Sequence, residues 1–114
     1  MLIKLIRSFS SAHHLPGYDG PCRNLHGHTW KAVFLIEGEI GPSGMVCDFK
    51  TVKKLLDDNL PDHRLLNDVL PNPTAELLAQ HLFKTIGEKL KQENLKLKSL
   101  EIWESENAAA VAQD

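Results

Sequence analysis

Length, composition and charge exclude several classes of protein. The chain has 114 residues, of which 42% are hydrophobic and 25% charged, the balance of a soluble globular protein, and we expect a single domain over residues 1–114. A formal net charge of −2 provides no basic field for nucleic acid, no segment is apolar enough to span a membrane, and the start lacks a signal peptide. Two cysteines, Cys22 and Cys47, form no disulfide framework, and free thiols predict a cytoplasmic location.

The first predicted strand covers residues 2–13, with an apolar face that Arg7 interrupts and that ends in His13. A loop rich in proline and glycine follows. A second strand is predicted over residues 28–40, where His28 lies on the same side as the apolar residues. Both strands therefore present a histidine on their apolar side, where a site that excludes water would form.

After a turn at residues 41–44 the apolar spacing becomes helical. Asp48 is the predicted N-cap of a first helix, which Pro61 ends. A second helix begins around residues 72–74, with a proline near its first turn and Glu76 near its positive end. The apolar positions of the first helix are Phe49, Val52, Leu55, Leu56 and Leu60.

Residues 97–105 return to strand alternation and place Leu100, Ile102 and Glu104 on one face. Residues 107–113 are either a short alanine-rich strand or a frayed end. The order strand, strand, helix, helix, strand, with or without a last strand, predicts an α+β fold with antiparallel pairing.

A metal site is predicted where His26-Gly27-His28 meets His13. Side chains at i and i+2 of a strand point to the same face, so His26 and His28 can converge on one ion. Three imidazoles would leave the fourth position of a tetrahedral zinc open, the pattern of a catalytic site, with Cys22 nearby as a thiolate. The alternative is a closed structural site in which Cys22 is the fourth ligand.

Two carboxylates, those of Asp62 and Glu104, are further candidate functional groups if the metal site is present. Asp62 and His63 are adjacent between the helices, and an imidazole beside a carboxylate is suited to proton transfer. The alternative is that Asp62 caps a turn and His63 is solvated. Glu104 lies on the apolar face of its strand, so it should meet a cationic or multi-donor ligand unless it reaches solvent.

In six motifs, arranged in order along nearly the whole chain, the sequence resembles the 6-pyruvoyltetrahydropterin synthase / 6-carboxytetrahydropterin synthase family. The resemblance implies that His13, His26 and His28 bind zinc and that Cys22 is the catalytic thiol. It also implies that Asp62 and His63 work with that thiol and that Glu104 anchors the pterin ring. The motifs are Phe9-Ser-Ser-Ala-His13, Cys22-x-x-x-His26-Gly27-His28, Gly44-Met45-Val46-x-Asp48-Phe49, Asp62-His63-x-x-Leu66-Asn67, Asn72-Pro73-Thr74-x-Glu76 and Glu104.

The same resemblance implies a fold and an assembly. The expected fold is the T-fold, a four-stranded antiparallel sheet with two helices on one face. Three sheets would join edge to edge into a barrel, and two barrels would stack as a homohexamer. Active sites would lie at subunit interfaces, with zinc and Cys22 on one chain and the Asp62–His63 pair supplied by a neighbour.

The implied substrate is 7,8-dihydroneopterin triphosphate. The short Cys22-x-x-x-His26 spacing favours the branch that forms 6-carboxy-5,6,7,8-tetrahydropterin, acetaldehyde and triphosphate for queuosine synthesis. The alternatives are the pyruvoyl-forming enzyme and a non-catalytic, zinc-stabilised module that binds a pterin or purine. Cys22 argues against the family variant that has glutamate there and performs aldol cleavage. Arg23, Lys31 and Arg64 lie near the motifs, and the sequence does not choose among them as the group that receives the triphosphate.

Overall fold

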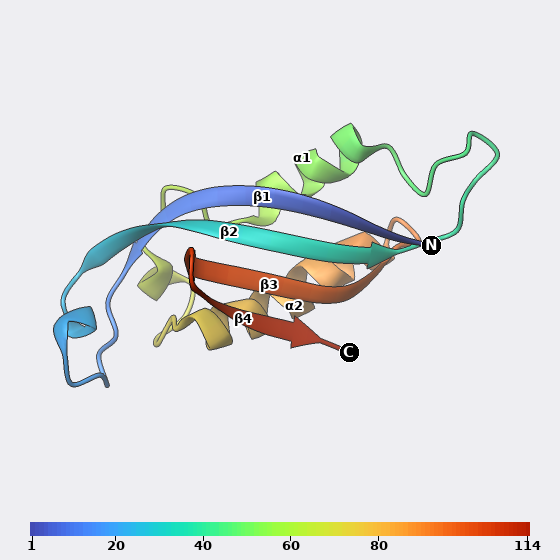
Figure 1. The fold of residues 1–114 in the computed structure, drawn as a ribbon. Helices are drawn as coiled ribbons and strands as arrows, with labels where there is room; N and C mark the ends of the chain where they lie inside the picture. Colours follow the sequence, from blue (N-terminus) through green and yellow to red (C-terminus); the bar gives the residue numbers. More distant parts are fainter.

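Four antiparallel strands in the order β1-β2-β3-β4 form the single sheet of the computed structural model, which describes all of residues 1–114. Helices α1 and α2 pack on one face of this sheet (Figure 1). The predicted α+β fold is therefore confirmed. The bounds are β1 (Leu2–His13), β2 (His26–Glu37), α1 (Phe49–Asn59), α2 (Ala75–Lys91), β3 (Lys96–Ser105) and β4 (Ala108–Gln113), with short 3₁₀ helices η1 (Pro21–Arg23) and η2 (Leu66–Asp68).

One core lies between the sheet and the two helices. Alternate residues of the strands enter it, which explains the period-2 pattern, and both helices add residues at a spacing of three or four. Arg7, which interrupts the apolar face of β1, reaches Asp57 of α1 through two hydrogen bonds of 2.8 and 2.6 Å. The strand residues of this core are Leu5, Phe9, Trp30, Ala32, Phe34, Ile36, Leu97, Leu100 and Ile102.

The bounds predicted for the second strand are wrong at both ends. The strand begins at His26 rather than residue 28 and ends at Glu37 rather than residue 40. Its early start follows from pairing, because His13 of β1 lies opposite His26 in the register. Its early end follows from Gly38, where a Cβ would lie 2.6 Å from Val46 Cγ1, so only glycine lets the next segment fold back this closely.

The predicted N-cap of the first helix is confirmed, and Thr74 caps the second helix, a role that the sequence analysis did not assign to it. Asp48 accepts the Lys50 N–H at 3.1 Å at the start of α1, and Thr74 accepts the Leu77 N–H at 3.1 Å at the start of α2. Phe49 is wrongly assigned to the buried face, since it is 51% exposed at the first position of α1. The last segment forms the short strand β4, so the frayed-end alternative is wrong.

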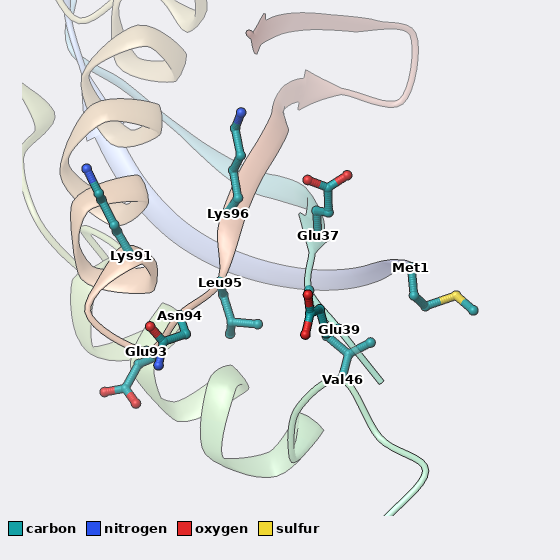
Figure 2. A pocket seen from close by; sticks show the side chains of 10 residues that line it. Met1, Glu37, Glu39, Val46, Lys91, Glu93, Asn94, Leu95 and Lys96 are labelled. Carbon is teal, nitrogen blue, oxygen red and sulfur yellow. The ribbon is translucent and has the colours of Figure 1, made fainter. Parts of the chain in front are cut away.

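The two ends of the sheet differ in their surroundings. Where β1 begins and β2 ends, a cavity of about 830 Å³ opens between residues 37–39 and the connection from α2 to β3 (Figure 2). The opposite end carries the histidines. No helix in the structure combines the length and apolar character needed to cross a membrane.

Candidate metal centre

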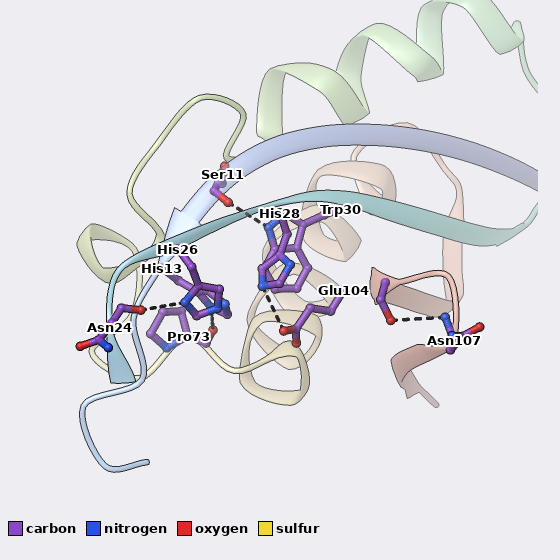
Figure 3. A network of polar contacts seen from close by, with 10 residues as sticks. Ser11, His13, Asn24, His26, His28, Trp30, Pro73, Glu104 and Asn107 are labelled. Carbon is purple, nitrogen blue, oxygen red and sulfur yellow. Dashed lines mark hydrogen bonds and ion pairs between the residues drawn. The ribbon is translucent and has the colours of Figure 1, made fainter. Parts of the chain in front are cut away.

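Three histidines and one glutamate converge where β1 ends and β2 begins (Figure 3). Each of His13, His26, His28 and Glu104 offers one ligand atom, and these atoms lie within 4.8 Å of one another. The antiparallel register places His13 beside His26, and the one-residue spacing keeps His28 on the same face. The centroids of the imidazole rings are only 4.5 to 5.1 Å apart. The predicted convergence of the three imidazoles is thus confirmed.

Backbone carbonyls fix the tautomer of two of these imidazoles. The Nδ1 atom of His13 lies 2.8 Å from the carbonyl oxygen of Pro73, and Nδ1 of His26 lies 2.7 Å from that of Asn24. A carbonyl oxygen only accepts hydrogen bonds, so each Nδ1 carries the proton and each Nε2 bears a lone pair. This is how metal-bound histidines are oriented in proteins.

None of the three Nε2 atoms makes a hydrogen bond, although that of His28 lies 3.1 Å from Glu104 Oε1. Those of His13, His26 and His28 are all buried, and buried polar atoms are normally paired. Burial lowers the pKa of His28 below its usual value against the opposing pull of Glu104, and His13 and His26 lower it further, so neutral imidazole is favoured. Three converging lone pairs on neutral rings fit a metal cation.

Glu104 completes this donor set. Its Oε1 lies 3.1 Å from His28 Nε2, and its side chain is 30% exposed. A carboxylate facing lone pairs is unfavourable unless a cation lies between them. That this glutamate meets a cationic or multi-donor ligand stays a prediction. Three imidazole nitrogens with a carboxylate oxygen suit zinc and, by chemistry alone, other first-row ions.

Trp30 walls the centre off from the core. It is fully buried, and its ring centroid lies 5.2 Å from those of His13 and His28 in edge-on contacts. Its Nε1 donates to the carbonyl oxygen of Ser11 at 3.3 Å, which links β2 to β1 beside the ligands. Sequence reasoning placed Trp30 on the histidine side of its strand but gave it no role at the site.

Cys22 lies in η1, between the two histidine strands, and is half-buried. Its thiol is not one of the four converging groups. The fourth group of the cluster is therefore Glu104 and not Cys22, unlike the closed set of three histidines and Cys22. Cys47 is also half-buried and packs against the core, and burial, followed by the charge of Asp48, raises the pKa of its thiol.

Asp62 and His63 form the predicted pair but stand apart from the four-group cluster. Asp62 Oδ2 lies 2.9 Å from His63 Nδ1, while Oδ1 accepts the Ser10 N–H at 2.8 Å. The Ser10 N–H and then His63 lower the pKa of Asp62. The side chain of His63 is 84% exposed, so its ring is solvated, as the alternative interpretation predicted. The ring is nevertheless paired with the carboxylate of Asp62.

The backbone of His63 is held in an uncommon conformation. Its φ of +55° is in the left-handed region, which costs a non-glycine residue on the order of 1 kcal/mol. The His63 N–H donates to the Ser10 carbonyl at 2.6 Å, and the Ala12 N–H donates to the Arg64 carbonyl at 3.3 Å. Pairing with β1 on both sides therefore maintains the turn that presents the imidazole.

Asn67 has a positional role that its motif did not reveal. Its side-chain oxygen accepts the His14 N–H at 3.0 Å, and its side-chain nitrogen donates to the His14 carbonyl at 2.9 Å. These two hydrogen bonds fix the backbone at the residue that follows His13. The His14 ring is not among the converging groups.

Comparisons with known proteins agree with this geometry. A model of the 6-pyruvoyl tetrahydropterin synthase family matches residues 2–114. A Synechocystis sp. protein named 6-carboxy-5,6,7,8-tetrahydropterin synthase is 38% identical over an alignment of 91 positions that covers 71% of this chain and 70% of that protein. A Pyrococcus furiosus protein named dihydroneopterin monophosphate aldolase is 38% identical over an alignment of 99 positions that covers 85% of this chain and 83% of that protein.

The structure of Caenorhabditis elegans 6-pyruvoyl tetrahydropterin synthase superposes with a TM-score of 0.85 at 25% identity, covering 100% of this chain and 95% of that one. The expected T-fold is thereby confirmed for the single chain. Since the family match spans nearly every residue and the sheet and helices follow the same architecture, the chain belongs to the 6-pyruvoyl tetrahydropterin synthase family.

Proposed function

We propose that this chain is a zinc-dependent 6-carboxy-5,6,7,8-tetrahydropterin synthase. It would convert 7,8-dihydroneopterin triphosphate to 6-carboxytetrahydropterin, acetaldehyde and triphosphate, a step that feeds queuosine synthesis. The observation that carries the proposal is the set of three buried, unpartnered Nε2 atoms beside Glu104. The name of the Synechocystis relative supports this branch of the family.

His13, His26 and His28 would hold the zinc through Nε2. Bound there, zinc would act as a Lewis acid that lowers the pKa of substrate hydroxyls and polarises a carbonyl. The carbonyls of Pro73 and Asn24 keep two of the rings oriented for this role. The buried face of Trp30 keeps water away on the core side of the site.

Glu104 would anchor the pterin. The amino-pyrimidine edge of a pterin presents paired N–H donors, which a carboxylate accepts with both oxygens. Only Oε1 approaches His28, and the side chain is partly exposed, so the carboxylate is accessible to a ring placed beside the metal. This position would bring the substrate side chain toward the three histidines.

Cys22 would remove a proton from the carbon next to the ring, with His63 carrying the proton onward. Asp62 accepts from His63 Nδ1, which leaves Nε2 of that ring free to exchange the proton. An 84% exposed imidazole is a poor catalyst until something covers it. We infer that a second copy does so, in a homohexamer built as a dimer of trimers with active sites at subunit interfaces.

The surface of the chain supports such an assembly. β1 and β4 are both edge strands of the sheet, and open edges tend to pair with another chain. The sheet face opposite the helices exposes apolar side chains, with Ile6 51% and Val111 55% exposed. Closing three sheets into a barrel would cover both features.

Two other products are possible within the family. The pyruvoyl-forming reaction is suggested by the likeness to the structure of C. elegans 6-pyruvoyl tetrahydropterin synthase. Aldol cleavage is suggested by the name of the P. furiosus relative. Cys22 favours the thiol-dependent reactions over aldol cleavage, and the Cys22-x-x-x-His26 spacing favours the carboxy-forming branch.

The decisive experiment incubates the zinc-loaded protein with 7,8-dihydroneopterin triphosphate and identifies products by mass spectrometry. Carboxytetrahydropterin with acetaldehyde is the expected outcome. A pyruvoyl product would move the assignment to the other branch, and bound but unchanged substrate would indicate a binding module. Cys22→Ala should abolish turnover while zinc content stays at one ion per chain.

A further inference from the structure

We propose that Arg64 is the cation that receives the phosphate tail of the substrate. The inference rests on the proposed function, because it concerns the same substrate and the same site. The sequence offers three basic residues for this role and does not choose among them, namely Arg23, Lys31 and Arg64.

The first argument is where Arg64 lies. A cavity of about 670 Å³ runs along the outer part of β1, and both the metal-cluster residue His28 and His63 of the acid–histidine pair line it. Arg64 is the only lysine or arginine among its lining residues. The hydroxyl groups of Ser10 and Thr29 line it as well, and these can donate to phosphate oxygens.

The second argument is that Arg64 is free to bind an anion. It takes part in none of the ion pairs of the structure, which join other residues. Lys31, in contrast, has its Nζ 4.8 Å from the ring centroid of Trp103, and the indole of Trp103 donates to Glu101 at 2.8 Å. Arg23 follows Cys22 in η1 and does not line this cavity.

The third argument is that the backbone fixes Arg64 beside His63. The Arg64 carbonyl accepts the Ala12 N–H, and Leu65 forms a parallel bridge with Ala12. Arg64 and His63 therefore stay together relative to β1. In the proposed homohexamer, where the pair serves a second copy, Arg64 would therefore reach the site of that copy together with His63.

The chemistry of the ligand explains why such a residue is needed. A triphosphate carries several negative charges, and the chain as a whole has a net charge of −2, so attraction must come from a local cation. A guanidinium binds phosphate oxygens through two parallel N–H donors, which an ammonium cannot do. One relative is named for a monophosphate substrate, so the length of the tail is a property in which family members differ.

The test measures binding of inorganic tripolyphosphate to the zinc-loaded protein by calorimetry, which needs no turnover. Arg64→Ala should weaken this binding about tenfold, the value of one charge-assisted hydrogen-bond pair, and Arg64→Lys should recover only part of it. Arg23→Ala and Lys31→Ala, which test the competing assignments, should bind tripolyphosphate like the wild type. Zinc content and the thermal unfolding midpoint verify that each variant is folded.

A second measurement compares ligands that differ only in the tail. Arg64→Ala should raise the dissociation constant of 7,8-dihydroneopterin triphosphate but leave that of unphosphorylated 7,8-dihydroneopterin unchanged. Wild-type affinity for tripolyphosphate in Arg64→Ala, or an equal loss for the unphosphorylated pterin, would overturn the proposal. A failed product assay combined with the expected tripolyphosphate result would overturn the proposed reaction and leave the anion site standing.

Discussion

The two ends of the sheet are both concave, yet only one has the chemistry of a site. At the end where β1 begins, the cavity of about 830 Å³ is larger than the 670 Å³ cavity near the histidines. Charged side chains of both signs line it, and Figure 2 shows Lys91, Glu93 and Lys96 extending in different directions. None of its side chains has a buried polar atom without a partner.

At the histidine end three buried nitrogens lack partners and point at one another. The difference has a structural origin. Paired strands bring His13, His26 and Glu104 together at fixed spacing, whereas the opposite end is formed by connections whose long side chains reach into solvent. Buried nitrogen lone pairs that converge without hydrogen bonds, rather than the volume of a cavity, therefore mark the functional end of this sheet.

If the ends differ in this way, removing one ligand should have the largest effect of any single change. His28→Ala should lower zinc affinity by more than about a hundredfold, since even residues that only orient ligands contribute 10- to 100-fold. Zinc content by mass spectrometry and catalytic turnover should fall together. Glu93→Ala, in the larger cavity at the other end, is the matched control and should retain wild-type zinc and turnover. Equal losses in both variants would remove the distinction between the ends.

The acid–histidine pair should come next in magnitude. Asp62→Asn removes the negative charge and replaces one of the two oxygens that accept the Ser10 N–H and the His63 Nδ1–H with an NH2 donor, which cannot accept either. Loss of a general acid–base partner costs about 10²-fold in kcat. Zinc content should stay unchanged, because neither residue belongs to the four-group cluster. Asp58→Asn, whose carboxylate pairs only with Lys54 on α1, is the control and should keep full activity. A loss of zinc in Asp62→Asn would mean that the pair supports the metal instead.

The same carboxylate predicts a pH dependence. Ser10 and His63 lower the pKa of Asp62 from its ordinary value of 3.8, so the folded state favours the ionised form. The stability this provides is present above the ordinary pKa and is lost as the pH falls through the lowered one. The difference in unfolding midpoint between the wild type and Asp62→Asn should thus be constant near neutral pH and vanish only in strong acid. A difference that disappears between pH 5 and 7 would contradict this assignment.

Much of the histidine end was predictable from the sequence, because it depends on local spacing. The His26-Gly27-His28 alternation and the face shared by His13 needed only the two-residue period of a strand. The orienting carbonyl of Pro73 was not predictable, since it lies 60 positions from His13 and belongs to the backbone. Nor was the early start of β2, which depends on how far the hairpin pairs.

The other departures have the same cause. Phe49 has the right helical spacing for burial, but at the first position of α1 it lines an open apolar pocket beside Met1 and Ile3 and stays half exposed. The placement of Glu104 on the apolar face followed from alternation, whereas its approach to His28 follows from the order of strands in the sheet. Spacing therefore identified the ligands, and tertiary pairing decided what each ligand faces.

A smaller effect is expected where the loop of Asp62 and His63 attaches to β1. The buried hydroxyl of Ser11 donates to the carbonyl of Pro61, the only hydrogen bond that carbonyl makes. Ser11→Ala should leave this carbonyl unpaired and lower the free energy of unfolding by about 1–3 kcal/mol. Ser8→Ala, at an exposed position of the same strand, should change it by less than about 0.5 kcal/mol. Urea unfolding of both variants gives the comparison, and similar values would show that the Ser11 contact contributes nothing.

The smallest effect is expected midway between the two ends, at the Arg7–Asp57 pair that joins β1 to α1. The geometry is bidentate, and the hydrogen bond to Asp57 raises the pKa of Arg7, which favours an ionic contact. The side chains are nevertheless 30% and 44% exposed, so solvent screens most of the attraction. A double-mutant cycle with Arg7→Met and Asp57→Asn should give a coupling of about 0.5–1 kcal/mol at low salt, falling toward zero in 1 M salt. Zinc affinity should be the same in all four proteins, because this contact lies away from the histidine end; a change in zinc affinity would mean that the middle of the sheet transmits strain to the ligands.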